Sequence, residues 1–364
     1  KTKNKMKKIK IFLMMLLAVL SFTACDDDDD SKQSIISEYS MNDQQVAAQK
    51  AKSGKDKAVL LVAFGSTWTN AFAAFDDTKK AYEDAFPDAD VYFCFSSDIC
   101  INRASAGEHG ESRNYYEPRY LLHAIGAAKY KTVYVQSLQV IPGEEFANVV
   151  AAVKKFANNG YVKDAHLDDE YLKTVEIHLG MPLLNDLDEV DDVAKLLNDL
   201  YQDEAAQGVV AFMGHGNPDN YDSFKANIRY TQLEKALQTY SKNYYVGTVD
   251  MKDNYKQNVM ARMQNNNITS GKVYLHALMS IAGDHAHNDM AGEGNDYWDA
   301  SEPTSEDNSW FEFFNHNGFT SVVPQTNGNP LGLLELPTIR QIWINHTKNA
   351  ELLEDAYHSM YPEE

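Results

Sequence analysis

The stretch VLLVAFGST, residues 59–67, gives the first indication of the fold of this 364-residue chain. It belongs to a continuous run of apolar, largely β-branched or aliphatic residues, 58–64, that stops at Gly65-Ser66. A strand that is apolar at every position is typical of a parallel sheet covered by helices on both faces. A helical pattern follows at 69–86, as expected for an alternating α/β arrangement.

The same pattern recurs along the chain and then restarts at VVAFMGHGN, residues 209–217. We therefore predict an α/β protein with two similar lobes, 57–206 and 207–364, each with a four-stranded parallel sheet and a cleft between them. The further strands are expected at 91–95, 132–140, 175–179, 208–213, 244–249, 272–280 and 319–323. The further helices are expected at 144–157, 186–206, 224–240, 255–265 and 337–358.

The charge balance excludes several classes of function. The chain has 33 basic and 53 acidic residues, a net charge of −20; without residues 1–25, which hold six lysines and no acids, 27 basic residues face 53 acidic ones. This argues against a general nucleic-acid binder, which neutralises phosphates with Lys and Arg, and against adsorption to anionic lipid. Hydrophobic residues make up 44%, enough for a large core.

The N-terminal residues have the pattern of a targeting signal. Lysines precede a short apolar run, 11–22, and Cys25 follows a small residue, which resembles a bacterial lipobox. We expect residues 1–25 to be a signal peptide, Cys25 to be lipidated, and the protein to be exported and anchored in the cell envelope, periplasmic or on the outer-membrane surface. The alternative is a plain signal peptide with an incidental cysteine.

An acidic and polar tether is expected at 26–56. It begins with five aspartates, 26–30, whose mutual repulsion favours a solvated chain. Such a run after a lipidated cysteine resembles the surface-export signal of Bacteroidetes lipoproteins; an uncommitted tether is the alternative. Residues 41–51 have the composition of a short helix.

Three residues suited to metal binding or proton transfer each follow a predicted strand of the second half: His215, Asp250 and His285. Ligands of open α/β sheets bind at the carboxyl ends of the strands, so these side chains are expected to converge. Two imidazoles and a carboxylate suit Co²⁺, Ni²⁺, Fe²⁺ and Zn²⁺. Each residue alone is more often a capping or solvated group, so the prediction depends on all three meeting.

The segment around His285 is rich in polar groups. Asp284 or Asp289 is expected to orient the His285 ring, and His287 is a reserve ligand; an Asx-rich turn is the alternative reading. The chain has no GxxxxGK[ST], GxGxxG or GxSxG motif, so nucleotide binding and serine hydrolysis lack their usual sequence signals.

These residues belong to a wider resemblance to a known family. The stretches that carry it are VLLVAFGST (59–67), VQSLQVIPGEEF (135–146), LGMPLL (179–184), FMGHG (212–216), VGTVD (246–250), LMSIAGDHAHNDMAG (278–292) and LPTIRQIWINH (336–346). Through these stretches the chain resembles the anaerobic sirohydrochlorin cobalt chelatases of the CbiK type, which are class II chelatases. The resemblance implies two flavodoxin-like lobes with a tetrapyrrole in the cleft.

The resemblance also implies that His215, Asp250 and His285 are the metal ligands, with the catalytic roles on His215 and His285. His215 is expected to accept the pyrrole proton as well. The family carboxylate is a Glu, one methylene longer than Asp250, and Gln139 stands where many members have His. Three aromatic residues near strand ends are candidates to stack on the macrocycle, although each is more often a core residue: Trp68, Phe64 and Phe95. Basic residues expected to meet its carboxylates are Arg103, Arg113, Arg119 and Arg229.

Three functions follow as hypotheses. The first is a chelatase that inserts Co²⁺, or Fe²⁺, Ni²⁺ or Zn²⁺, into sirohydrochlorin or a related tetrapyrrole. The second is a surface lipoprotein that binds haem or removes its iron. The third is a non-catalytic metal- or tetrapyrrole-binding protein, which the Asp250 replacement permits. A homo-oligomer is possible in each case, and the only membrane contact expected is through the lipid anchor.

Overall fold

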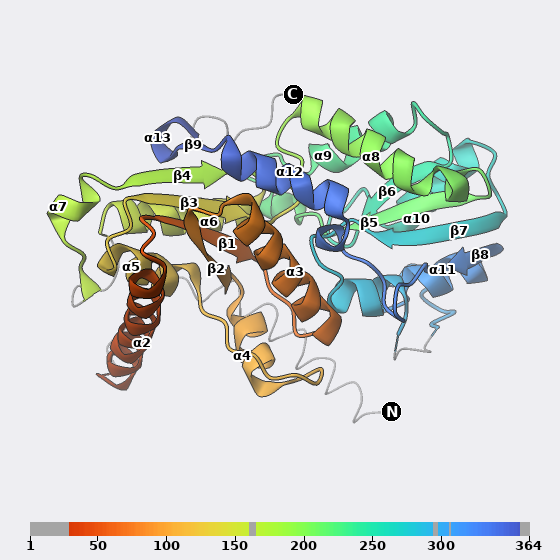
Figure 1. Ribbon diagram of the computed structural model, residues 1–364. Helices are drawn as coiled ribbons and strands as arrows, with labels where there is room; N and C mark the ends of the chain where they lie inside the picture. The colour runs from red at the N-terminus through yellow and green to blue at the C-terminus, as the bar shows by residue number, and fades with distance from the viewer. Residues whose placement is uncertain (1–28, 160–164, 294–297, 306, 357–364) are drawn as a thin grey trace.

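A computed structural model describes residues 29–159, 165–293, 298–305 and 307–356 (Figure 1). The predicted signal peptide and Cys25, the predicted lipidation site, lie outside these residues, as do the first three aspartates of the predicted tether. Within the described part of the chain, no helix combines the length and the apolar character needed to cross a membrane.

The first lobe is built on a parallel sheet of β1 (Lys57–Ala63), β2 (Ala89–Phe95), β3 (Thr132–Ser137) and β4 (Glu176–Gly180), in the order β2-β1-β3-β4. The central strand β1 is buried on both faces, which is why its sequence is apolar without alternation. One face is covered by α3 (Thr69–Ala85) and the other by α5 (Pro118–Ala127) and α6 (Glu144–Ala157), while α4 (Asp98–Ala106) follows β2 and α7 (Asp169–Leu172) precedes β4.

The second lobe repeats this arrangement. Its sheet contains β5 (Val209–Gly214), β6 (Tyr244–Thr248), β7 (Gly271–Ala277) and β8 (Phe319–Val322), all parallel, in the order β6-β5-β7-β8. The helices α8 (Leu187–Ala205) and α9 (Ile228–Leu237) cover one face, and α10 (Lys256–Asn265) and α11 (Trp310–His316) cover the other. The flavodoxin-like strand order of both lobes and all eight predicted strands are confirmed.

The predicted limits of the second lobe, residues 207 and 364, are both wrong. The helix α12 (Pro337–Lys348) packs on β3 and β4, and β9 (Glu351–Leu352) pairs antiparallel with β4, so the C-terminal segment belongs to the first lobe (Figure 1). The apolar side of α12 explains this return, since Ile339 and Trp343 are buried and the Trp343 indole donates to the Gln139 carbonyl at 3.2 Å. Conversely, α8 packs on α9 and β5 of the second lobe. The predicted helix at 337–358 ends early; α13 (Leu353–Ala356) follows β9.

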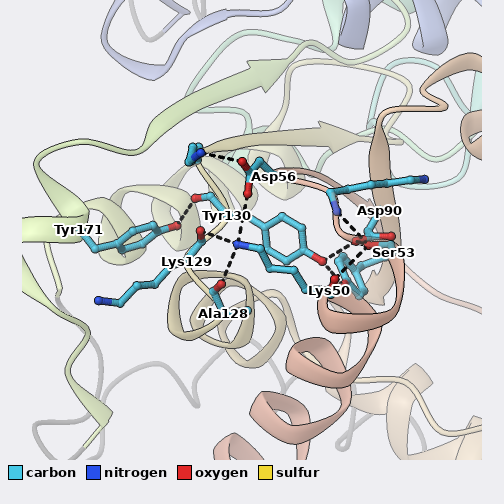
Figure 2. A network of polar contacts seen from close by, with 11 residues as sticks. Lys50, Ser53, Asp56, Asp90, Ala128, Lys129, Tyr130 and Tyr171 are labelled. Carbon is cyan, nitrogen blue, oxygen red and sulfur yellow. Dashed lines mark hydrogen bonds and ion pairs between the residues drawn. The ribbon is translucent and has the colours of Figure 1, made fainter.

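The predicted tether is also corrected, because α2 (Asp29–Ser53) is a helix that packs on α5. The predicted helix at 41–51 forms its C-terminal part. Lys50 Nζ donates to the carbonyls of Ala128 and Lys129, at 2.9 and 2.7 Å, where α5 ends (Figure 2). A cation is favourable at that position because the last carbonyls of a helix are unpaired.

The end of α2 is further held by a carboxylate at the start of β2. The hydroxyls of Ser53 and Tyr130 both donate to Asp90 Oδ2 at 2.6 Å, and Gln49 Nε2 donates to Oδ1 at 3.0 Å (Figure 2). Asp90 is buried, so these three donors replace the water that its charge loses. Polar contacts such as these leave no apolar periodicity in the sequence, which is why the attachment of α2 was not predicted.

Candidate metal centre

The three predicted ligands come together at one edge of the second sheet. His215 follows β5, which lies between β6 and β7, and the neighbouring strands lead to Asp250 and His285. His215 Nε2 is 3.7 Å from Asp250 Oδ2. The rings of His215 and His285 are nearly perpendicular, at 80°, with centroids 4.9 Å apart. The predicted convergence is confirmed.

Hydrogen bonds fix the proton on the same ring nitrogen of both histidines. His215 Nδ1 lies 2.7 Å from the Gly216 carbonyl, and His285 Nδ1 lies 2.6 Å from Asp289 Oδ2. A carbonyl and a carboxylate only accept, so Nδ1–H donates in each case and Nε2 keeps its lone pair. Of the two residues expected to orient His285, Asp289 is the one that does so. Both Nε2 atoms are therefore available to a metal ion or a proton.

The spacing of these groups approaches that of a metal site without reaching it. Two ligands about 2.1 Å from a tetrahedral ion lie roughly 3.4 Å apart, slightly less than the separation of His215 and Asp250. Among the described residues, no group of three or more His, Cys, Asp and Glu side chains has the mutual spacing needed to hold a metal ion. The assignment of His215, Asp250 and His285 as metal ligands therefore stays a prediction.

The first lobe contributes a carboxylate that the sequence analysis did not single out. Glu145 lies in the first turn of α6, and its charge interacts with those of His215, His285 and Asp250. Burial raises the pKa of Glu145, and although the two histidines act in the opposite direction, the net shift is upward. The available signal was its position after β3, at an edge where α/β sheets bind ligands.

Close contacts between the lobes bring Glu145 to this position. A Cβ atom at Gly143 would lie 2.7 Å from the Asn217 side-chain amide, so the start of α6 lies close against the loop after His215. Glu144 Oε1 accepts the Ser223 backbone N–H at 2.9 Å. These contacts tie the N-terminus of α6 directly to the second lobe.

Negatively charged groups surround His285 and stabilise positive charge at its ring. Burial lowers the pKa of His285, but the hydrogen bond and charge of Asp289, with the charges of Asp250 and Asp284, outweigh it and raise the pKa above its ordinary value. The same negative charges would attract a divalent cation.

Asp284 and His287 have roles other than the predicted ones. Asp284 Oδ1 accepts the Trp68 indole N–H at 2.6 Å, so this aspartate joins the lobes rather than orienting His285. His287 is fully buried, donates from Nδ1 to Glu293 at 2.6 Å, and stacks on Trp68 with centroids 3.7 Å apart. The reserve ligand is thus part of the packing between the lobes.

The aromatic residues expected near a macrocycle separate into two groups. Phe95 is fully buried and stacks on Tyr115 at 3.8 Å, so it is a packing residue. Trp68 stacks on His109 and His287 but is only partly buried, and its side chain lines a hollow between the lobes. Phe64 is 44% exposed and is the most exposed of the three.

The predicted basic residues are also unequal. Arg229 is buried and donates to the Asn185 carbonyl at 2.6 Å, Arg113 pairs with Asp76 and Glu111, and Arg119 pairs with Glu117. Arg103 is 40% exposed and makes longer ion pairs, at 3.3 Å to Glu108 and 3.7 Å to Asp284. Of the four, Arg103 is the one next to the segment that carries His285.

A hollow of ≈ 540 Å³ lies between the lobes, beside the site. The first lobe lines it with Trp68, Thr69, Asn70, Ala73 and His109, and the second half of the chain lines it with Thr326, Asn327, Asn329 and Glu335. The three predicted ligands do not line it, but Trp68, which does, contacts Asp284 and His287 on either side of His285 in the sequence. A hollow between the lobes is thus present, and its wall includes a residue that contacts the segment carrying His285.

Comparison with known proteins gives consistent matches. A family model described as cobalt chelatase (CbiK) matches residues 57–351. A sirohydrochlorin cobaltochelatase of Salmonella typhimurium is 26% identical over 301 residues, covering 81% of this chain and 96% of that protein. The sirohydrochlorin cobaltochelatase CbiKC of Nitratidesulfovibrio vulgaris is 26% identical over 243 residues, covering 66% and 78%.

The fold is also found in a solved structure. SirB from Bacillus subtilis with Fe³⁺ superposes with a TM-score of 0.50 at 13% identity, covering 80% of this chain and 94% of that one. At this identity the match supports the two-lobed α/β fold alone.

Proposed function

This chain belongs to the cobalt chelatase (CbiK) family, and from that membership we propose that it inserts Co²⁺ into sirohydrochlorin. The observation that carries the proposal is the pair of histidines, His215 and His285, whose free Nε2 atoms share an edge of the sheet with Asp250. Neutral imidazoles and a carboxylate are suitable ligands for Co²⁺ as the incoming substrate. The names of the two relatives do not refer to haem, so the haem-handling alternative is not favoured.

Insertion also requires a base, because two pyrrole N–H protons leave the macrocycle as the metal enters. We propose Glu145 for this role in place of His215, whose lone pair is needed for the metal. Burial raises the pKa of Glu145, and a carboxylate with a raised pKa is a stronger base than one at its ordinary value. Glu145 comes from the opposite lobe, so a macrocycle between the lobes would have the metal ligands on one side and the base on the other.

The test is an absorbance titration of the full chain with sirohydrochlorin and Co²⁺. Wild type should form cobalt-sirohydrochlorin faster than the uncatalysed mixture, and the variant with both His215→Ala and His285→Ala should not. Lys195→Gln, in an exposed ion pair on α8, is the matched control and should behave as wild type. Equal insertion by the double variant and wild type, with both folded, would contradict the proposal.

We further propose that the protein is exported and lipid-anchored through Cys25. The support is the sequence alone: the lysines, the apolar run at 11–22 and the position of the cysteine. Mass spectrometry of the envelope fraction should find lipid on Cys25, and Cys25→Ser should release the protein from membranes. A wild-type chain cleaved elsewhere and free of lipid would refute this part.

A further inference from the structure

Two exposed apolar residues of the first lobe follow neighbouring strands of its sheet. Phe64 directly follows β1 and is 44% exposed, and Ile99 is the second residue of α4, directly after β2, and is 38% exposed. The strands β1 and β2 are neighbours, and the Ser97 backbone N–H donates to the Phe64 carbonyl at 3.1 Å. An exposed apolar surface that is bordered by polar groups can serve as a binding site.

The strand pattern places Phe64 on the side of the sheet from which Glu145 comes. Leu60 and Val62 of β1 point into the core under α5 and α6, and side chains of a strand alternate, so Phe64 falls on that same side. Glu145 starts α6 after β3, the other neighbour of β1. Phe64 and Glu145 therefore lie on either side of the switch point between β1 and β3, where the strand order of the sheet reverses. Open α/β sheets usually bind their ligands at this point.

A cation borders this apolar pair. Arg103 lies four residues after Ile99 on α4, and residues with this spacing share one face of a helix. Its partners Glu108 and Asp284 are 3.3 and 3.7 Å away, and all three side chains are at least 40% exposed. Such solvated ion pairs contribute little, so Arg103 can exchange them for an incoming carboxylate at small cost.

We propose that Phe64, Ile99 and Arg103 form the platform on which the macrocycle lies. This rests on the proposed function, since sirohydrochlorin combines a flat conjugated ring with many carboxylates. Phe64 and Ile99 cover one face of the ring, and Arg103 binds a carboxylate at its edge. In a chain of net charge −20, a carboxylate-rich ligand needs such a local cation. Phe64 and Arg103 are thus substrate-binding residues of the first lobe, opposite the metal ligands of the second.

The experiment measures binding of three metal-free tetrapyrroles to the full chain by absorbance titration. Sirohydrochlorin and uroporphyrin carry eight carboxylates, and mesoporphyrin carries two. Phe64→Ala should weaken binding of all three by about tenfold, whereas Phe64→Leu should retain most of the affinity. Arg103→Gln should weaken binding of the two octacarboxylates by about threefold and of mesoporphyrin by less, and the difference should disappear at high salt.

The kinetics of cobalt insertion distinguish a substrate-binding role of Phe64 and Arg103 from a merely structural one. Both variants should raise KM for sirohydrochlorin while kcat stays within about twofold of wild type, because the metal ligands and Glu145 are untouched. Lys195→Gln should change neither constant. If wild type binds and metallates sirohydrochlorin but Phe64→Ala and Arg103→Gln do so equally well, the platform is refuted and the proposed function stands. If wild type does neither, the proposed function fails and the platform with it.

Discussion

Replacement of Asp289 by Asn tests whether His285 is a metal ligand whose affinity is raised by the Asp289 carboxylate. The Asp289 carboxylate accepts from His285 Nδ1 at 2.6 Å, and an amide oxygen can accept the same hydrogen bond. The change therefore removes one negative charge and little else. An ion bound at Nε2 would lie roughly 6–7 Å from that charge, given ordinary bond lengths across the ring.

The size of the effect follows from the exposure of the pair. Both side chains are 40% exposed, so the interaction is screened nearly as in water. A divalent ion and one charge at this separation then interact by about 1.3 kcal/mol, which corresponds to about a tenfold change in Kd. Loss of a carboxylate behind a histidine ligand typically costs 10- to 100-fold in metal affinity, so we expect the lower end of about tenfold.

The assay is a competition titration of Co²⁺ between the protein and a chromophoric chelator, without tetrapyrrole. Asp289→Asn should raise the Kd by about tenfold, and His285→Ala should raise it further. Asp199→Asn, which removes the carboxylate of an exposed ion pair on α8, is the control and should have no effect. Co²⁺ binding by Asp289→Asn within about twofold of wild type would show that His285 is not a ligand oriented by Asp289.

Three further predictions concern Glu145, Asp90 and Trp68. Glu145→Gln should keep Co²⁺ binding but slow insertion by about 100-fold or more, as loss of a general base does; equal insertion rates after rapid mixing would contradict this. Burial raises the pKa of Asp90, but the hydrogen bonds from Ser53, Tyr130 and Gln49 outweigh it and hold the pKa below its ordinary value. The charged Asp90 therefore stabilises the folded protein at neutral pH, and this contribution is lost as the pH falls below about 4. Urea unfolding should therefore show Asp90→Asn about 2 kcal/mol less stable than wild type near neutrality and a smaller difference in acid; a difference that does not shrink would be inconsistent with a charged Asp90. Trp68→Phe keeps an aromatic ring on His287 but removes the hydrogen bond to half-exposed Asp284, and should lower the free energy of unfolding by about 1 kcal/mol; an unchanged urea midpoint would show that this bond contributes nothing.

The strands and the three converging residues could be predicted because their signals are local. A buried parallel strand such as β1 must be apolar at every position, and the parallel topology alone brings the residues after β5, β6 and β7 to one edge. Nothing beyond strand positions was needed to expect His215, Asp250 and His285 to meet.

The parts that were missed depend on contacts between distant segments. Glu145 lies near the predicted ligands because the start of α6 packs against the loop after His215, where Gly143 approaches Asn217 across more than 70 residues of sequence. The attachment of α2 involves Lys50 and Asp90, and charged residues are expected from sequence to lie exposed at the surface. The return of α12 to the first sheet depends on the surface left open by the other helices, which no short window of sequence records.

The two crossings of the chain between the lobes hold them together. The chain passes from the first lobe to the second before α8 and comes back before α12, so two covalent connections join the halves. One hydrophobic cluster also runs through both halves, with Leu61 of the first sheet and Phe212 of the second among its buried members. Glu145 comes from one half and His215 from the other, so neither half is a complete unit without the other.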